Sequence, residues 1–287
     1  MSKKILSYSL WGNTPMYTFG AIRNAELSLI HFPDWICRFY ISNDVDKEIV
    51  DKLKSFNHTE VVIVPEKPDS WQGSMWRFFA IDNKEDIDYI VFRDTDSRLT
   101  EREASAVNEW IDSERTIHIM RDHPCHTEAI MAGMWGCRPK ELLSELIEKL
   151  DIQELNFSCM EEIINAWLKI EQQKTIENHP ECLHHTVYHT KGIDQQFLRR
   201  VLYKLFWNTA FIHDSFPSYN CFSGRFDHQQ FTTKELNTGF PHQRGEDWND
   251  FIGQVYDEND VPNEEYANLL KQRDECIYMN YPKEDAE

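Results

Sequence analysis

The chain has 287 residues, a mass of 34.2 kDa and a formal net charge of −19. So much negative charge excludes nucleic-acid binding through a general basic surface and disfavours anionic membranes, because both kinds of partner expose phosphates. The mean hydropathy is −0.60, and no apolar run approaches the roughly 18 residues that span a bilayer. We therefore expect a cytoplasmic protein without a membrane span, built as one large α/β domain.

Runs of apolar residues alternate with helical periodicity through the first half of the chain. Strands are expected at residues 3–12, 35–42, 59–66, 88–97 and 116–122. Helices are expected at residues 16–32, 46–56, 71–83 and 101–113. This alternation predicts a mostly parallel central sheet flanked by helices, whose ligands bind at the carboxyl ends of the strands.

The second half is more helical and then becomes rich in loops. Helices are expected at residues 139–150, 159–174 and 193–207, followed by a short strand at 209–215. Between them lies a histidine-rich segment, 179–189, with five side chains able to bind zinc: His179, Cys182, His184, His185 and His189. Their spacing matches no zinc signature, which favours a polar loop. The seven scattered cysteines form no CxxC pair, which predicts reduced thiols.

Two aspartates one residue apart end the fourth predicted strand, in the stretch DYIVFRDTDSRLT. In a strand, Asp94 and Asp96 point to the same side, and their mutual repulsion is costly unless a cation lies between them. Mg²⁺ or Mn²⁺ suits such a pair, because a hard cation takes carboxylate oxygens and leaves positions for phosphate oxygens. The alternative is an acidic surface turn.

The stretch IDYIVFRDTDSRLT resembles the Asp-x-Asp strand of GT-A glycosyltransferases, with EREASAVNEW, MRDHP and AGMWG following in order. More narrowly it is similar to uncharacterised glycosyltransferase-like proteins of polysaccharide gene clusters, over about residues 4 to 255. The resemblance implies a GT-A (Rossmann-like) α/β domain at 1–255 with a helical, loop-rich C-terminal elaboration. Residues 1–138 would bind the nucleotide sugar, 139–255 would face the acceptor, and 256–287 would form an acidic tail.

The resemblance also implies which residues meet the donor, a nucleotide-diphosphate sugar. Tyr8, Trp11 and Gly12 would contact the base or ribose, although a tryptophan packed under a loop is the ordinary alternative. Arg77 would reach the donor phosphates, since a guanidinium suits phosphate through its fork of donors. Three residues of the motif itself, together with a weaker candidate far along the chain, complete this set: Arg93, Asp94, Ser97 and Arg244.

Further residues would face the sugar and complete the metal site. Gly133 would let the sugar approach the backbone, and His123 would hydrogen-bond a sugar hydroxyl. In GIDQQFL, Asp194 and Gln195 resemble the pair that faces the transferred sugar, with Asp194 as general base or sugar-positioning group; a helix N-cap is the alternative. In FIHDSF, His213 would join Asp94 and Asp96 around Mn²⁺ or Mg²⁺.

The expected function is therefore that of a metal-dependent, hexosyltransferase-like enzyme that transfers a sugar to a hydroxyl acceptor. One rival is a haloacid-dehalogenase-like phosphohydrolase, in which Asp94 would attack phosphorus and Asp96 would protonate the leaving group. That motif normally follows the first strand, whereas here it follows the fourth. Two further rivals are a nucleotidyltransferase of similar fold and a non-catalytic GT-A-like binding protein.

Overall fold

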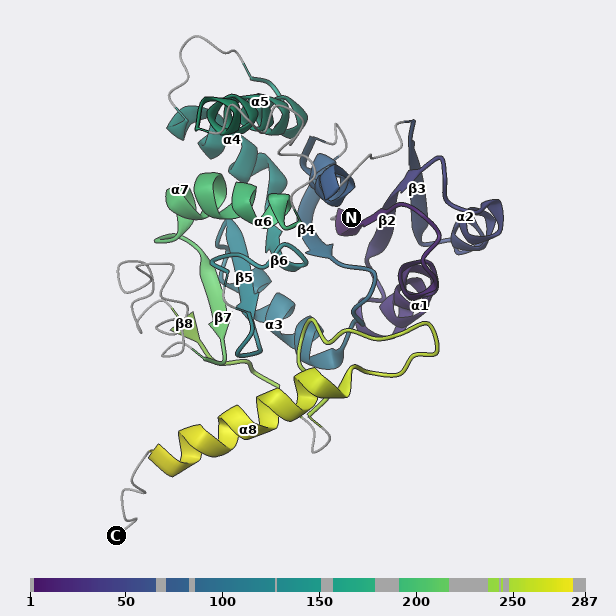
Figure 1. The fold of residues 1–287 in the computed structure, drawn as a ribbon, viewed down its shortest axis with the longest axis vertical. Helices are drawn as coiled ribbons and strands as arrows, with labels where there is room; N and C mark the ends of the chain where they lie inside the picture. Colours follow the sequence, from purple (N-terminus) through teal and green to yellow (C-terminus); the bar gives the residue numbers. More distant parts are fainter. Residues whose placement is uncertain are drawn as a thin grey trace.

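A computed structural model shows one eight-stranded sheet in the residues that it describes, which are 3–65, 71–82, 86–126, 128–150, 157–178, 191–216, 237–242, 244 and 248–280 (Figure 1). Its strands are β1 (Lys3–Leu10), β2 (Ile36–Ser42), β3 (Thr59–Val64), β4 (Ile87–Arg93), β5 (Ile117–Arg121), β6 (Met134–Cys137), β7 (Phe211–Asp214) and β8 (Asn237–Thr238). The spatial order is β3-β2-β1-β4-β6-β5-β7-β8, and only β6 runs antiparallel to its neighbours. The predicted α/β class with a mostly parallel central sheet is confirmed.

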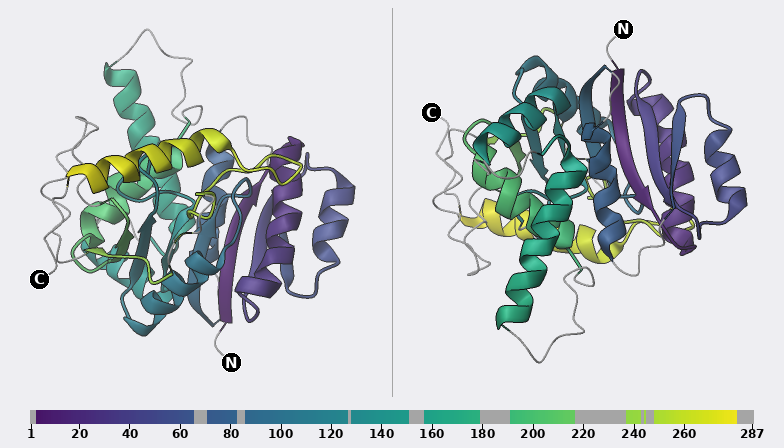
Figure 2. Two further views of the ribbon diagram at one scale, coloured as in Figure 1. Left: turned by 90° about the horizontal axis from the view of Figure 1, so that it is seen from below. Right: turned by 90° about the horizontal axis from the view of Figure 1, so that it is seen from above.

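Helices cover both faces of this sheet (Figures 1 and 2). They are α1 (Pro15–His31), α2 (Lys47–Lys54), the 3-10 helix η1 (Trp71–Asp82), α3 (Glu101–Asp112), α4 (Pro139–Lys149), α5 (Met160–Asn178), α6 (Ile193–Phe197), the π-helical turn η4 (Leu198–Tyr203), α7 (Lys204–Phe206) and α8 (Glu264–Asn280). One apolar cluster joins the sheet to η1 and α4–α6, and a second joins it to α1 and α3. None of the helices in the described part of the chain is long and apolar enough to cross a bilayer.

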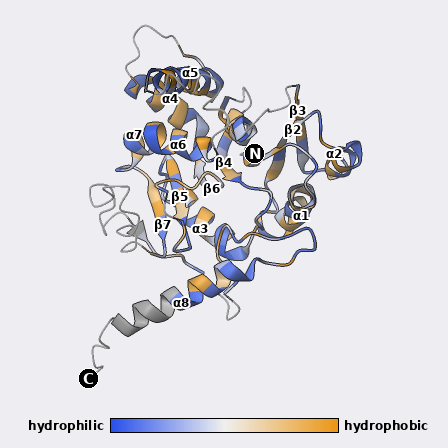
Figure 3. Cartoon of the chain, in the orientation of Figure 1, coloured by the Kyte–Doolittle hydropathy of each residue, from blue (hydrophilic) through white to orange (hydrophobic). Residues whose placement is uncertain are grey.

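The central strands are apolar because both of their faces are covered. In β1 and β4, Ile5, Leu6, Ile90, Val91 and Phe92 are fully buried. Figure 3 shows the same pattern on β5 and β7, which are coloured as hydrophobic, whereas α2 at the edge is largely hydrophilic. The fold therefore follows directly from the apolar runs that the sequence distributes between its helices.

Helix α1 packs on the sheet through small residues, so that it can lie unusually close to the end of β4. Its buried positions are Thr18, Gly20, Ala21, Asn24, Ala25 and Ser28. A Cβ on Gly20 would lie 1.9 Å from the backbone oxygen of Thr95. From the same helix, the Asn24 amide donates to the Ser97 carbonyl at 2.7 Å and accepts from the Leu99 N–H at 3.1 Å. Thus α1 fixes the turn that follows β4.

The order of the strands reverses between β1 and β4, which lie side by side in the middle of the sheet. From β1 the chain continues outward to β2 and β3, and beyond β4 the sheet continues through β6 and β5 in the opposite direction. At such a reversal the connections leave to opposite sides, and a crevice remains at the carboxyl ends of the two strands. Asp94 and Asp96 follow β4 at this point.

Three elements differ from those expected. The fourth strand ends at Arg93, so the two aspartates lie in a turn rather than in the strand itself. Residues 134–137, for which no strand was expected, form β6, because an apolar run of four residues that is interrupted by Gly136 is too short to indicate a strand from sequence. Residues 264–280 fall within the expected acidic tail, but they form α8, which runs away from the sheet in Figure 1.

Candidate functional site

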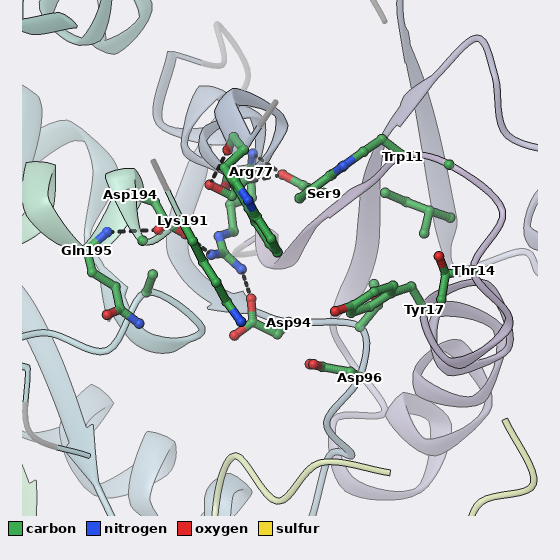
Figure 4. Close-up of a pocket in the computed structure, with 17 residues that line it drawn as sticks. Ser9, Trp11, Thr14, Tyr17, Arg77, Asp94, Asp96, Lys191, Asp194 and Gln195 are labelled. Atoms are coloured by element: carbon green, nitrogen blue, oxygen red, sulfur yellow. Dashed lines mark hydrogen bonds and ion pairs between the residues drawn. The ribbon is translucent and has the colours of Figure 1, made fainter. Parts of the chain in front are cut away.

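A cavity of about 570 Å³ opens at the carboxyl ends of β1 and β4 (Figure 4). Its walls come from the end of β1 and the start of α1, from η1, from the turn after β4 and from the start of α6. It brings together predicted residues that are as many as 184 positions apart in the sequence: Trp11, Gly12, Arg77, Asp94, Asp96, Asp194 and Gln195. The strand reversal thus produces a ligand-sized cleft that contains half of the predicted donor residues.

The turn after β4 presents two carboxylates with different surroundings. The Asp94 side chain is 51% exposed, and its backbone oxygen accepts a hydrogen bond from the Ser97 hydroxyl at 3.1 Å. Burial, and then the neighbouring charge of Asp94, raise the pKa of the Asp96 carboxyl to about 6. Two carboxylates that repel one another in this way form a site that favours a cation.

Arg77 connects this turn to the start of α6. Its guanidinium is 3% exposed and forms an ion pair with Asp94 on one side, while it donates to Asp194 at 2.7 Å on the other (Figure 4). Both carboxylates raise the pKa of Arg77 against the opposing effect of burial. The second oxygen of Asp194 accepts from the Gln195 N–H at 2.9 Å, and the N-cap of α6 is Gly192, so Asp194 does not cap the helix.

Two serines on β1 place Arg77 in this position. The Ser7 hydroxyl donates to the Arg77 carbonyl at 2.7 Å, and the Arg77 N–H donates to the Ser9 hydroxyl oxygen at 2.9 Å. Because Ser7 and Ser9 are two residues apart on a strand, they face the same side and hold η1 against the sheet. The backbone of Arg77 is therefore fixed independently of its ion pairs.

Arg93, which was predicted to contact the donor phosphates, lies behind the turn instead. It is 1% exposed and donates to the Gly133 carbonyl at 2.6 Å and to the Ser97 hydroxyl oxygen at 3.0 Å. Its Nε lies 3.1 Å from Glu103, whose pKa is raised to about 7 by burial. The prediction for Arg93 is wrong in its role, since a guanidinium enclosed in this way braces the turn.

A segment from the end of the chain crosses the same turn, and we call residues 254–262 the C-terminal strap. The Tyr256 N–H donates to the Asp96 carbonyl at 2.8 Å, and Val255 forms an antiparallel bridge with Ser97. Arg98, beside the motif, donates to Asp260 of the strap at 2.6 Å. Arg98 therefore anchors the strap and does not point into the cavity.

A second cavity of about 210 Å³ lies against the same two aspartates. Asp94, Asp96, Ala132 and Gln195 line both cavities, so the aspartates stand where the two spaces meet. The other walls of the second cavity come from residues 123–126, 131–134, 251–255 and Tyr266. Of the predicted residues, Ser97, His123 and Gly133 lie in this wall.

Gly133 is required by the carboxylate itself. A Cβ at this position would lie 2.1 Å from Oδ2 of Asp94, which is a collision that the carboxylate can relieve only by moving. For the metal site predicted from the sequence, we expect Gly133→Ala to weaken binding of Mn²⁺ with a nucleotide diphosphate at least ~10-fold, with a stability loss of about 1–3 kcal/mol. Isothermal titration of the two ligands together would measure this loss.

Gly239→Ala is the matched control, because a Cβ there would meet nothing within 4 Å. We expect it to leave binding unchanged. Equal binding by the Gly133 and Gly239 variants would mean that the position of the Asp94 carboxylate does not matter for the metal.

His213 does not reach the two aspartates. It is fully buried in β7, with Nδ1 2.8 Å from Nε2 of His118 and Nε2 2.8 Å from the Glu109 carboxylate. Neither cavity is lined by it. In the part of the chain that the structure describes, no group of three or more His, Cys, Asp or Glu residues is placed to hold a metal ion. The prediction of His213 as a ligand is therefore wrong.

Three other predicted contacts also point elsewhere. Tyr8 is fully buried and stacks on Phe39 with ring centroids 4.8 Å apart, so it does not reach a base or ribose. Arg244 donates to the Asp122 carboxylate at 2.9 Å. His123 lines the second cavity, but its ring nitrogens are both used within the protein. The histidine-rich segment 179–189 lies outside the described residues.

No protein-family model matches the chain, and no curated protein matches it. Solved structures that resemble it are distant in sequence. The galactosyltransferase LgtC, solved with donor and acceptor sugar analogues, is 12% identical with a TM-score of 0.46, over 94% of this chain and 95% of that one. A fragment of TarS from Staphylococcus aureus is 12% identical with a TM-score of 0.37, over 57% of this chain and about half, 53%, of that fragment.

Glucosyl-3-phosphoglycerate synthase from Mycobacterium tuberculosis, solved with Mn²⁺, UDP-glucose and phosphoglyceric acid, is 12% identical with a TM-score of 0.35, over 50% of this chain and 59% of that one. The enzyme 4-diphosphocytidyl-2C-methyl-D-erythritol synthase from Anaerococcus prevotii is 9% identical with a TM-score of 0.37, over 56% of this chain and 81% of that one. Resemblance at this level bears on neither the substrate nor the mechanism of this chain.

Several lining residues were not predicted from the sequence. Lys191 precedes Gly192 at the mouth of the first cavity, and its ammonium lies 5.3 Å from the ring centroid of Trp71. Trp71 in turn packs edge-on to Trp11, with ring centroids 6.2 Å apart. The basic residue immediately before GIDQQFL was the available signal for Lys191. For Trp71 there was none, because it faces the cavity only once η1 has packed on β1.

Proposed function

We propose that the chain is a metal-dependent, hexosyltransferase-like glycosyltransferase that moves a sugar from a nucleotide-diphosphate sugar to a hydroxyl acceptor. The observation that carries the proposal is the position of Asp94 and Asp96, between a large cavity and a smaller one, with Arg77 linking Asp94 to Asp194. A transferase needs separate spaces for donor and acceptor that meet at the reacting atoms. The site has that arrangement.

The two aspartates suit Mn²⁺ or Mg²⁺. The pKa of Asp96 is raised by burial and by the charge of Asp94, so a cation between the carboxylates would relieve an existing repulsion. Two carboxylates provide fewer ligands than such a cation takes, and the donor diphosphate would supply the others. A bound cation would there neutralise the charge that develops on the departing nucleotide.

The residues around the aspartates divide the remaining tasks. Trp11, beside Gly12, offers an aromatic wall for the base or ribose, and Lys191 offers a cation at the mouth of the same cavity. Both oxygens of Asp194 are held by Arg77 and Gln195, which favours a sugar-positioning role over that of a general base. Arg77 thereby keeps the donor-binding and sugar-binding carboxylates at a fixed separation.

The phosphohydrolase alternative is less favoured by this geometry. Its first aspartate must attack phosphorus, whereas the Asp94 carboxylate is ion-paired with a buried arginine that also holds Asp194. The motif also follows β4 rather than the first strand of the sheet. A non-catalytic binding protein of the same fold stays as the second candidate, because a protein that binds these ligands without catalysis would need the same two cavities.

A thermal-shift screen of nucleotide sugars, with and without Mn²⁺, tests the proposal. We expect one donor to raise the melting temperature only when the metal is present, because the diphosphate and the aspartates share it; saturation at 100 times Kd corresponds to about 2.7 kcal/mol. The same donor should then release its nucleotide diphosphate when acceptors are supplied.

Stabilisation by beryllofluoride and not by nucleotide sugars would instead support the phosphohydrolase. Donor binding without any nucleotide release, over a broad acceptor panel, would support the binding protein. EDTA provides the internal control, since it should remove the donor-dependent shift while leaving the melting of the free protein unchanged.

A further inference from the structure

The second cavity has the features of a binding site for one chemical class. We propose that it binds an uncharged sugar unit of the acceptor, and that His126 is the residue that positions this unit by donating a hydrogen bond. The reaction that follows rests on the proposed function, but the binding itself does not. The cavity adjoins the first one at Asp94, Asp96 and Gln195, so its occupant would lie beside a donor sugar.

The backbone determines which nitrogen of His126 carries the proton. The Asp122 N–H donates to Nδ1 of His126 at 3.1 Å, so Nδ1 is the acceptor and the proton is on Nε2. Burial lowers the pKa of His126 to about 3, so the ring is neutral at physiological pH. Among the residues that the structure describes, Nε2 has no hydrogen-bond partner. It is a neutral donor in the wall of the cavity.

The neighbouring His123 shows the contrast. The Cys125 N–H donates to its Nδ1 at 3.0 Å, and its Nε2 lies 2.9 Å from the carbonyl oxygen of Tyr266. Both ring nitrogens of His123 are thus used to hold the loop after β5 against the start of α8. A hydrogen bond to sugar was predicted for His123, and the geometry reassigns this role to His126, three residues later.

Glycine keeps the approach to His126 open. Gly253 has a φ of +87°, and a Cβ there would lie 3.4 Å from Nε2 of His126 and 2.6 Å from the sulfur of Met134. A side chain at this position would therefore narrow the cavity directly above the free donor. Beside it, Phe251 and Tyr266 supply aromatic surface, which suits the apolar faces of a sugar ring.

The charge around the cavity selects an uncharged occupant. Asp94 and Asp96 form one side, and the charge of a cation between them would be matched by the donor diphosphate. Behind the wall, Arg93 pairs with Glu103, and Arg102 and Arg244 share the single carboxylate of Asp122, and none of these three arginines lines the cavity. None of the described residues that line the cavity is Lys or Arg. A phosphate or carboxylate on the acceptor would therefore be repelled, whereas neutral hydroxyl groups would not.

Direct binding of small probes tests the proposal without turnover. Saturation-transfer NMR would compare methyl β-D-glucopyranoside and methyl β-D-galactopyranoside with glucose 6-phosphate and 3-phosphoglycerate, with and without Mn²⁺ and UDP. We expect a neutral glycoside to bind and the phosphorylated compounds to bind at least ~10-fold more weakly. The ¹⁵N signal of Nε2 of His126 should shift as the glycoside is added.

Variants separate positioning from structure. We expect His126→Phe to weaken glycoside binding roughly 5- to 10-fold, and His126→Gln, which keeps a donor, to recover most of the loss. His31→Phe, at the end of α1 and in neither cavity, is the matched control and should bind as the wild type does. Thermal melting would establish that each variant is folded, and the ¹⁵N titration of the wild type needs no variant.

Three results would overturn the proposal: no glycoside binding in any condition, phosphorylated probes binding as tightly as neutral ones, or unchanged binding by a folded His126→Phe variant. Failure of the proposed function looks different. In that case nucleotide sugars would neither bind with Mn²⁺ nor be consumed, while glycoside binding and its dependence on His126 could still be present.

Discussion

Replacing Asp96 with asparagine should reduce turnover by at least ~1,000-fold while leaving the fold intact, because the proposed metal ion would lose one of its two protein carboxylates. The assay would follow nucleotide release from the donor that stabilises the wild type with Mn²⁺. The backbone carbonyl of Asp96 would still accept from Tyr256 of the C-terminal strap, so the turn itself should keep its shape.

The same substitution should make the metal-free protein more stable above pH 6. The carboxyl pKa of Asp96 is about 6 in the folded chain, against 3.8 as its ordinary value. As the pH rises, this carboxyl ionises at a lower pH in the unfolded chain than in the folded one. The free energy of unfolding of the wild type therefore falls as the pH rises from about 4 to about 6. Because Asp96 is partly exposed, we expect a gain of about 1 kcal/mol for Asp96→Asn at pH 7.5, vanishing below pH 4.

Chemical denaturation in EDTA over this pH range would measure the difference. Asp34→Asn, which removes one carboxylate at an exposed position, is the matched control for the change in net charge. Full activity of Asp96→Asn with Mn²⁺ would contradict the metal site. Lower stability of the metal-free variant at pH 7.5 would contradict the burial of a repelled carboxylate.

The largest loss of stability is expected for Arg77→Met. The substitution leaves Asp194, whose side chain is 9% exposed, without its buried counter-charge, and the carboxylate of Asp94 loses the same partner. Breaking one half of a buried ion pair costs about 3–5 kcal/mol; since Asp94 is half-exposed, we expect about 3 kcal/mol. Arg77→Lys should keep part of the stability but lose most of the activity, because an ammonium lacks the fork that spans both carboxylates.

A double-mutant cycle distinguishes the ion pair from simple packing. Arg77→Met with Asp194→Asn should be more stable than Arg77→Met alone, because the unpaired buried charge is gone, yet it should stay inactive. The exposed pair of Arg23 and Asp260, each 42% exposed, is the matched control, and Arg23→Met should cost no more than ~1 kcal/mol. Additive effects in the Arg77 cycle would contradict the proposed bridge.

Sequence patterns identified the sheet and part of the site for physical reasons that are easy to state. Apolar runs separated by helical periodicity predicted the strand alternation, and the strand reversal then brought Trp11, Asp94 and Asp194 to one cavity. Arg77 was expected among them because a guanidinium suits anionic groups. In the structure it holds two carboxylates of the protein rather than an open position for phosphate.

The errors share one cause, which is that sequence does not tell toward which side a polar residue near a strand end turns. His213 turns inward to His118, and Arg93 turns behind the motif to Glu103. His123 and His126 are chemically identical in the sequence. In the structure, Nδ1 of each ring accepts from a backbone N–H group. Nε2 of His123 is bonded to the carbonyl oxygen of Tyr266, whereas Nε2 of His126 is a free donor.

The C-terminal strap determines at which stage of folding the candidate site is completed. The turn that carries Asp96 is complete only when Val255, Tyr256 and Asp260 have docked, and these residues are made about 160 positions after it. Contacts so distant in sequence form late, because a long loop must close first. The growing chain on the ribosome can therefore build its sheet before its two aspartates are held in place. The candidate site is then completed after the sheet has formed, and not at the same time.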